Sequence, residues 1–295
     1  MFYIPETELI INPDGSIYHL GICPGQISNI ILTVGDPERV KQVAHFFDKK
    51  EPITCKREFV TQTGEYNGKR ITVMSTGMGT DNMDIFLNEL DALFNIDFQT
   101  RTIKSSKTVL YIIRIGTSGS IRPEIEPDAL LATHYSVALD ILPHYYQIEN
   151  SYLEISLNLQ NHLRLSYVPV VSCASDLLLK TVGEGLIWGT TATCPGFYAP
   201  QGRTLRLSSR FSNWIDKLQS FHSQGFRITN LEMETSAYYT LGKSLGHEVL
   251  STNAILANRI NKKFSKNPEK TIEKLILHVL EKVSQKDLGK ITDAN

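Results

Sequence analysis

The sequence has few cysteines, and none lies close to another along the chain. The four are Cys23, Cys55, Cys173 and Cys194, and they form no C-x-x-C pair. This spacing argues against a zinc site or a disulfide framework and favours reduced thiols. A cytoplasmic protein is therefore expected.

Strong charge of one sign and long apolar runs are also absent. The formal net charge of the 295 residues is -1, so no basic field favours nucleic acid or an anionic membrane as a partner. No apolar run approaches the roughly 20 residues that span a bilayer. The opening stretch MFYIPETELIINPDGS lacks the basic and apolar regions of a signal peptide. An enzyme acting on a small molecule is the default expectation.

Neither a G-x-x-x-x-G-K-[ST] loop nor a G-x-G-x-x-G motif occurs, so a P-loop and a dinucleotide site are not expected. Strand-like and helix-like segments instead alternate from residue 28 almost to the end. This alternation predicts an α/β fold in one domain, residues 1–295, with a substantially parallel sheet. The expected strands are 29–35, 71–77, 109–115, 129–140, 167–175 and 248–258, the helices 36–47, 81–94, 230–245 and 268–286, and the surface loops 97–107 and 258–270.

A single charged residue interrupts one of these strands. Six of the seven residues in VLYIIRI (109–115) are apolar, the pattern of a strand buried on both faces, but Arg114 stands just before a glycine-rich turn. An unpaired buried guanidinium costs on the order of several kcal/mol. Arg114 therefore needs an anion, either a carboxylate in a buried salt bridge or a bound phosphate.

Glycine-bearing turns follow three of the expected strands. They are VGDPER, STGMGTDN and RIGTSG, at the carboxyl ends where α/β sheets collect ligands. Glycines let backbone N–H groups turn towards an anion. Any one of them is most simply a tight turn, and Arg39 alone a solvated helix residue, but three together favour phosphate.

Six motifs carry a family resemblance: TVGDPERV, KREF, STGMG, RIGTSGSI, FYAPQGR and NLEMETSA. In order and rough spacing the chain resembles the uridine phosphorylase branch of the nucleoside phosphorylase family over about residues 18–283. This resemblance implies a twisted central mixed β-sheet flanked by α-helices. It also implies a pentosyltransferase of nucleoside catabolism and pyrimidine salvage, which converts uridine and phosphate reversibly to uracil and ribose 1-phosphate.

For the anion of Arg114, the resemblance implies inorganic phosphate. The implied phosphate site consists of Gly35, Arg39, Arg114 and Thr117, with Arg57 supplied by a neighbouring subunit. Fork-shaped guanidinium donors suit a phosphate dianion. They would also aim the phosphate at C1′ of the ribose.

The implied ribose site consists of Met233 and Glu234, with Glu232 beside them and His19 reaching across from a neighbour to the 5′ end. A carboxylate can accept the 2′ and 3′ hydroxyl protons and suits a cationic transition state. Taken alone, the two glutamates are more simply a solvated helix face, and His19 a structural residue.

The implied base site consists of Phe197, Gln201 and Arg203, with Arg259 supporting Arg203. A glutamine amide can donate to one uracil carbonyl and accept from N3–H, while Arg203 faces O4. The resemblance makes Arg114, Arg203 and Arg259 the catalytic groups. Without it, FYAPQGR is more simply a Pro/Gly surface loop.

Two departures from the family pattern stand out. GMGTDN replaces the family's GxGxPS, so a monovalent cation such as K+ between subunits would be held by Glu58, the Met78 carbonyl and Asn82. No other cofactor is implied, because phosphate is a co-substrate. The segments 97–107 and 143–155 are longer than in bacterial relatives.

Two other functions stay open: a phosphorylase with broader or purine preference, and a non-catalytic nucleoside-binding protein on the same fold. Purine-cleaving relatives carry an aspartate where this chain has Asn258 and Arg259, which favours a pyrimidine. The full arginine set favours catalysis. Because His19 and Arg57 match residues that serve a neighbour's site, a homo-oligomer is expected, built from a dimer unit and assembled as a hexamer.

Overall fold

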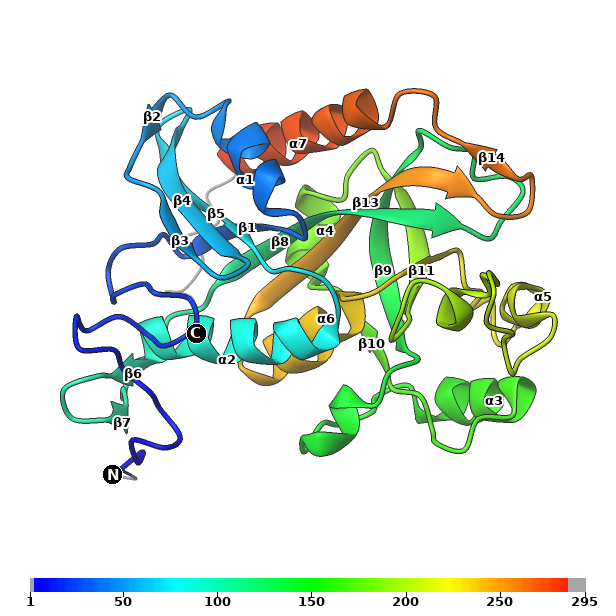
Figure 1. The fold of residues 1–295 in the computed structure, drawn as a ribbon, viewed down its shortest axis with the longest axis horizontal. Helices are drawn as coiled ribbons and strands as arrows, with labels where there is room; N and C mark the ends of the chain where they lie inside the picture. The colour runs from blue at the N-terminus through cyan, green and yellow to red at the C-terminus, as the bar shows by residue number, and fades with distance from the viewer. Residues whose placement is uncertain (1–2, 286–295) are drawn as a thin grey trace.

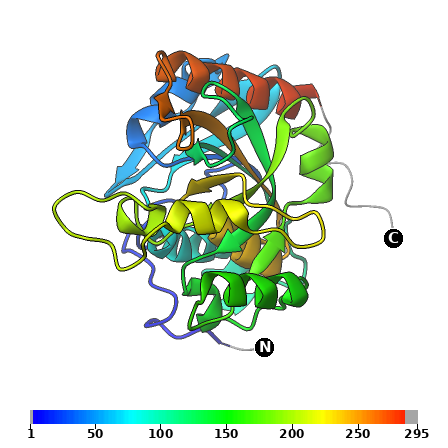
Figure 2. The same cartoon turned by 90° about the vertical axis from the view of Figure 1, so that its right-hand side faces the viewer.

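A mixed sheet of 12 strands forms the centre of the molecule, seen here in a computed structural model that describes residues 3–285. Figure 1 shows α1 and α7 on one side of this sheet, and α2 and α6 on the other. In Figure 2, α3 and α5 lie together at the end of the molecule that faces the viewer. The expected single α/β domain with a central mixed sheet and flanking helices is confirmed.

The bounds of the elements follow the chain. The helices are α1 Pro37–Ala44, α2 Thr80–Asn95, α3 Leu153–Leu163, α4 Asp176–Thr181, α5 Trp214–Ser220, α6 Thr235–Ser244 and α7 Pro268–Gln285, with 3-10 turns η1 Leu142–Tyr145 and η2 Ala199–Gln201. The strands are β1 Ile30–Val34, β2 Lys49–Lys50, β3 Thr54–Lys56, β4 Phe59–Tyr66, β5 Lys69–Ser75, β6 Ile96–Asp97, β7 Thr102–Ile103, β8 Tyr111–Ser120, β9 Leu130–Ala138, β10 Val171–Cys173, β11 Ile187–Thr193, β12 Asn230–Glu232, β13 Glu248–Asn258 and β14 Lys263–Phe264.

Most of the strongly apolar segments form the elements that their patterns predict. The first helix starts as expected, because the Asp36 side chain accepts from the backbone N–H of Glu38 and Pro37 occupies the first turn. β13 matches its expected range, 248–258, at both ends. The last residue of the expected terminal helix, 286, lies outside the described residues.

The expected glycine-rich turn after Ile115 is wrong. β8 continues to Ser120, so Gly116 and Gly119 lie inside the strand. Parallel pairing with β13 covers the whole stretch, from Tyr111 opposite Glu248 to Ser120 opposite Asn258. This long ladder, with one register shift between Ile255 and Ala257, outweighs the weak strand preference of glycine.

Other differences follow from polar strands that periodicity does not reveal. The segment expected as a helix over 230–245 begins as β12, and only 171–173 of the expected strand 167–175 pairs in the sheet. β4 and β11 were not expected, because FVTQTGEY and IWGTTAT are rich in polar residues. The expected loops 97–107 and 258–270 contain the short strands β7 and β14.

Five of the strands close into a ring. β13 pairs with β9, β9 with β11, β11 with β12, β12 with β8, and β8 again with β13. A closed ring leaves no free edge among these strands and fixes which residues face each other. The remaining strands extend the sheet from β8 through β1, β5 and β4. None of the helices within residues 3–285 is long and apolar enough to cross a membrane.

Candidate active site

Arg114 is buried, with only 6% of its surface exposed. On β8 it stands opposite Thr33 of β1 and Ser251 of β13. Its Nη2 lies 2.6 Å from a Glu234 carboxylate oxygen and 3.1 Å from one of Glu232. The buried salt bridge weighed from the sequence is therefore present, and phosphate would be a further partner of the same guanidinium.

The other nitrogen of this guanidinium contacts neutral groups. Nη1 donates to Oδ1 of Asn253 at 3.1 Å and to the Ser251 hydroxyl at 3.4 Å. With Glu234 on Nη2 these make three hydrogen-bond acceptors for a group that carries five N–H donors, so donors are left over for an additional acceptor.

Gly116 makes room for this side chain. A Cβ placed on Gly116 would lie 1.9 Å from Nη1 of Arg114 and 2.4 Å from its Cζ. Residues two apart on a strand share a face, so the guanidinium folds directly over the position where a side chain at residue 116 would stand. The glycine of the RIG motif is thus required by the arginine before it.

The two glutamates are both buried, at 4% and 6% exposure, so the solvated helix face considered for Glu232 and Glu234 is wrong. Burial opposes the charge on Arg114, but the two carboxylates outweigh it and raise the pKa of the guanidinium above its ordinary value. Burial also raises the pKa of Glu234, and the charge of Arg114 opposes that rise. The charges of Arg114, Glu232 and Glu234 are buried together, and removing one would leave the others without compensation.

Protein donors surround Glu232. It accepts from the backbone N–H groups of Glu234 and Thr235, each at 2.9 Å, and from the Thr193 hydroxyl at 2.6 Å. It therefore caps the start of α6 and holds Glu234 and the half-buried Met233 in place. Glu234 in turn accepts from the backbone N–H of Gly79 at 2.8 Å. A contact of Glu232 with ribose stays a prediction.

Arg39, on α1, is half-buried and electrostatically coupled to Arg114. Burial lowers the pKa of Arg39, Asp36 opposes this, and the like charge of Arg114 lowers it further. Two cations that repel each other favour an anion between them. Gly35 stands at the end of β1, where a Cβ would lie 3.4 Å from the Gly77 carbonyl, and Thr117 is half-buried on β8.

His19 and Arg57, the two residues assigned to a neighbour's site, both contact the same aromatic ring. The Tyr18 ring packs edge-on against His19, with 4.7 Å between ring centroids, and the guanidinium of Arg57 is 5.6 Å from its centroid. His19 is anchored by Glu89, whose carboxylate lies 2.6 Å from Nδ1 and accepts from the backbone N–H groups of His19 and Leu20.

The base-site residues form a connected group. Nη1 of Arg203 donates to Oε1 of Gln201 and to the Phe197 carbonyl, both at 2.7 Å, and its Cζ is 3.6 Å from the centroid of the Phe197 ring. Nη1 of Arg259 donates to the backbone carbonyl of Gln201 at 3.0 Å. Gln201 is only 3% exposed, so the interpretation of its polar side chain as incidental is wrong, although Phe197 and Tyr198 of the same loop are exposed.

This group carries two neighbouring cations. Burial and the adjacent Arg259 lower the pKa of Arg203 to about 10. The loop leaves the sheet after β11, whose Thr193 pairs with Glu232 of β12. The base group therefore begins beside the strand that ends at the buried Glu232.

The three residues expected around a cation gather at Gly77. A Cβ on Gly77 would lie 2.3 Å from Nδ2 of Asn82 and 3.2 Å from Cγ of Glu58, and Nδ2 of Asn82 is 3.5 Å from the Met78 carbonyl. Between residues 3 and 285 no group of three or more His, Cys, Asp or Glu side chains could hold a metal ion. The cation site stays a prediction.

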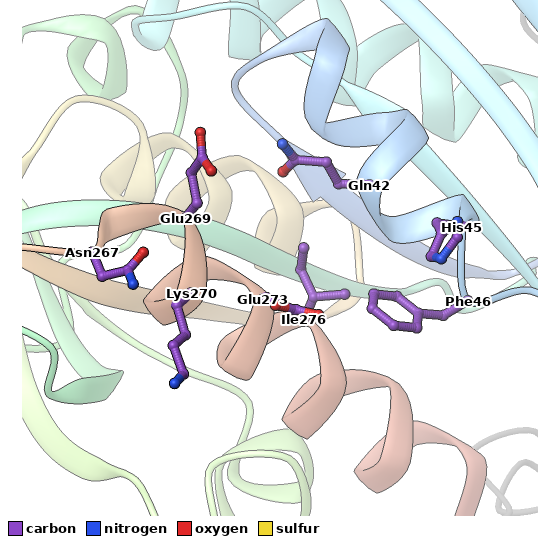
Figure 3. Close-up of a pocket in the computed structure, with 8 residues that line it drawn as sticks. All are labelled: Gln42, His45, Phe46, Asn267, Glu269, Lys270, Glu273 and Ile276. Atoms are coloured by element: carbon purple, nitrogen blue, oxygen red, sulfur yellow. The ribbon is translucent and has the colours of Figure 1, made fainter.

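A groove of about 500 Å³ lies elsewhere, between α1 and α7 (Figure 3). Its lining is formed by Gln42, His45, Phe46, Asn267, Glu269, Lys270, Glu273 and Ile276. None of these residues belongs to the phosphate, ribose or base groups, so the groove is separate from the candidate active site.

Several residues of the site were not expected from the sequence: Glu89, Thr193, Ser251 and Asn253. For Ser251 and Asn253 a signal was available, because they belong to the polar run STN inside the otherwise apolar strand 248–258 and, two residues apart, lie on one face of it. The same kind of interruption singled out Arg114. For Glu89 and Thr193, only the three-dimensional contacts reveal the role.

The chain belongs to the phosphorylase superfamily, whose family model matches residues 29–282. It is 31% identical over 270 residues to the uridine phosphorylase of Thermococcus kodakarensis, covering 90% of this chain and 84% of that protein. A crystal structure of a Trypanosoma brucei nucleoside phosphorylase that shows uridine phosphorylase activity matches with a TM-score of 0.85 and 29% identity, covering 94% of this chain and all of that one.

A purine nucleoside phosphorylase of the DeoD type from Alkaliphilus metalliredigens is more distant, at 28% identity over 79% of this chain and 84% of that protein. The resemblance to uridine phosphorylases is confirmed by these comparisons.

Replacing Gly116 by alanine tests the position of Arg114. The new Cβ must displace the guanidinium from its acceptors, and a misplacement of about 1 Å in an active site costs roughly 100-fold. We expect Gly116→Ala to lower kcat/KM for nucleoside phosphorolysis by about that factor. Gly119→Ala is the matched control on the same strand, because a Cβ there would meet only ordinary contacts at 3.7 Å or more. Equal efficiency of the Gly116→Ala and wild-type proteins would show that the guanidinium does not need this space.

Proposed function

We propose that this protein is a uridine phosphorylase, which converts uridine and phosphate reversibly to uracil and ribose 1-phosphate. The observation that carries the proposal is the buried Gln201, whose amide oxygen accepts from Arg203 and whose backbone carbonyl accepts from Arg259, on a loop that starts beside Glu232 of the Arg114 cluster. The relatives named above support it. We further propose that residues 1–295 form one nucleoside phosphorylase domain and act in the cytoplasm in pyrimidine salvage.

Phosphate binds between the arginines. Arg114 and Arg39 supply charge-assisted donors, Thr117 a hydroxyl and Gly35 a backbone N–H, while Arg57 comes from a neighbouring subunit. The mutual repulsion of Arg39 and Arg114 is relieved when a dianion enters. Phosphate held in this way is aimed at C1′ of the nucleoside.

Ribose binds against the carboxylate side of the same ion pair. Glu234 accepts the 2′ and 3′ hydroxyl protons, and its charge favours the positive character that develops on the ribose as the glycosidic bond breaks. Met233 and Glu232 complete this side of the pocket, and His19 of a neighbour reaches the 5′ end. Glu234 and Arg114 are 2.6 Å apart, so ribose bound to Glu234 and phosphate bound to Arg114 lie next to each other.

The base is recognised by the Gln201 group. Its amide pairs with one carbonyl and the N3–H of uracil, Phe197 packs against the ring, and Arg203 with Arg259 behind it faces O4. As the bond to N1 breaks, negative charge spreads to O4, where Arg203 stabilises it. No proton donor is needed for such a leaving group.

The purine alternative is disfavoured by Asn258. Its Nδ2 donates to the carbonyls of Arg122 and Ile125, and its Oδ1 accepts from the backbone of Ile260 and Asn261. This buried side chain is fully used within the protein and does not face a leaving purine. The reaction needs phosphate but no cofactor. A monovalent cation such as K+ at Glu58, Met78 and Asn82 would serve the subunit interface.

Uridine, cytidine and inosine, each with and without phosphate, test the assignment on the wild type and on three variants. We expect uracil release only with phosphate, and poor use of cytidine, whose N3 has no proton for Gln201 and whose amino group points donors at Arg203. Gln201→Ala should raise the uridine KM and blur this discrimination. Arg203→Ala should lower kcat by about 100-fold, as for loss of one oxyanion donor.

Arg206→Ala is the matched control, since Arg206 is exposed on the same loop. Efficient phosphorolysis of inosine by the wild type would contradict the uridine assignment. Normal uridine turnover by the Arg203→Ala variant would refute the role of this loop. Binding of uridine with no phosphate-dependent cleavage would favour the non-catalytic alternative.

The assembly is tested by co-expressing two inactive variants. In the proposed dimer unit, three of which form a hexamer, each site combines Arg114 of one subunit with Arg57 of its neighbour. Arg57→Ala and Arg114→Ala alone should both be nearly inactive, but a mixed dimer contains one intact site. Random pairing in a twofold dimer restores about a quarter of wild-type activity. Failure to recover activity, in mixtures shown by differential tags to be mixed dimers, would refute the shared site.

A further inference from the structure

A chain of hydrogen bonds runs around the closed ring of strands and ends at Arg114. Nδ2 of Asn253 donates to Thr133 at 3.2 Å, the hydroxyls of Thr133 and Thr191 are 2.6 Å apart, and Thr191 donates to Oδ1 of Asn230 at 3.1 Å. Nδ2 of Asn230 then donates to Ser118 at 3.0 Å. These five buried side chains belong to β13, β9, β11, β12 and β8, so every strand of the ring contributes one.

The chain has one consistent direction. Because the hydroxyl proton of Thr191 goes to Asn230, Thr133 has to donate to Thr191. The oxygen of Thr133 is then free to accept from Asn253, which turns the amide nitrogen of Asn253 towards Thr133. Its carbonyl oxygen must therefore face Nη1 of Arg114, where it lies at 3.1 Å.

A neutral acceptor suits this position. Nη2 of Arg114 already faces two carboxylates, and a third would increase the negative charge around this one guanidinium and oppose phosphate binding. An apolar side chain would leave Nη1 with only the longer contact to Ser251 at 3.4 Å, and the guanidinium would be held less firmly on this side. Asparagine accepts without charge, and the ring fixes its orientation.

We propose that Asn253 is a positioning residue that fixes the plane of the Arg114 guanidinium and thereby sets the affinity for phosphate. It touches no substrate. The inference rests on the proposed function, in which Arg114 binds phosphate. Its effect should be larger on phosphate than on uridine, because Arg114 binds phosphate directly, whereas uridine is also held by the Gln201 group through separate contacts.

The test compares the KM values for phosphate and uridine in two variants. Asn253→Ala removes the acceptor and should raise the phosphate KM about tenfold, the loss expected for one hydrogen bond to a charged group. Asn253→Asp keeps the shape and the acceptor but adds a charge and removes the donor to Thr133, and it should raise the phosphate KM further. The uridine KM should rise by a clearly smaller factor than the phosphate KM in both variants.

Asn95→Ala is the matched control. Asn95 is equally buried and hydrogen-bonded to Asp91 and Thr108, at the far end of α2. Its replacement should lower thermal stability and leave the ratio of the two KM values unchanged, which is the result that a merely structural role of Asn253 would also give.

The outcomes separate the two claims. A wild-type protein without phosphate-dependent cleavage of uridine would overturn the proposed function and this inference with it. An active wild type whose Asn253→Ala and Asn253→Asp variants keep the wild-type phosphate KM would overturn this inference alone. The aspartate variant, which is isosteric, gives an answer even where the alanine variant does not fold.

Discussion

The buried ion pair between Arg114 and Glu234 is the contact on which the rest of the site depends. Two charges removed from water are tolerated only when geometry and additional hydrogen bonds compensate for their lost hydration. The surrounding residues supply that compensation: Gly116 leaves space for the guanidinium, Asn253 accepts from it, and Gly79 donates to the carboxylate. Glu232 adds a second negative charge and caps the helix that presents Glu234.

This arrangement explains how one contact can serve two substrates. In the proposed reaction phosphate approaches the arginine and ribose approaches the glutamate, so the 2.6 Å contact between them lies beside the bond that is exchanged. The base is recognised by a separate group on the loop after β11. In this group Arg203 donates to the side-chain amide oxygen of Gln201, and Arg259 donates to the backbone carbonyl of Gln201. Recognition of uracil and binding of phosphate therefore depend on different residues.

The sequence alone predicts the alternation of strands and helices, and the family resemblance supplies the candidate site residues. Strongly apolar segments such as 29–35 and 248–258 are found close to their expected bounds. The polar strands β4 and β11 are missed, because their pairing is decided by neighbours and not by their own pattern. Arg114 is identified by its conflict with an apolar run, but its partners Glu234 and Asn253 lie 120 and 139 residues away along the chain. Such contacts depend on strand register, which periodicity does not fix.

The most direct test of the central claim is a crystal structure of the protein with phosphate and uracil. The account predicts phosphate oxygens within about 3 Å of the guanidinium nitrogens of both Arg114 and Arg39, with Arg114 still paired to Glu234 and the uracil imide against Gln201. Phosphate bound elsewhere, with Arg114 contacting only Glu232, Glu234 and its neutral acceptors, would contradict it. In that case the buried arginine would be a structural salt bridge and not the phosphate ligand.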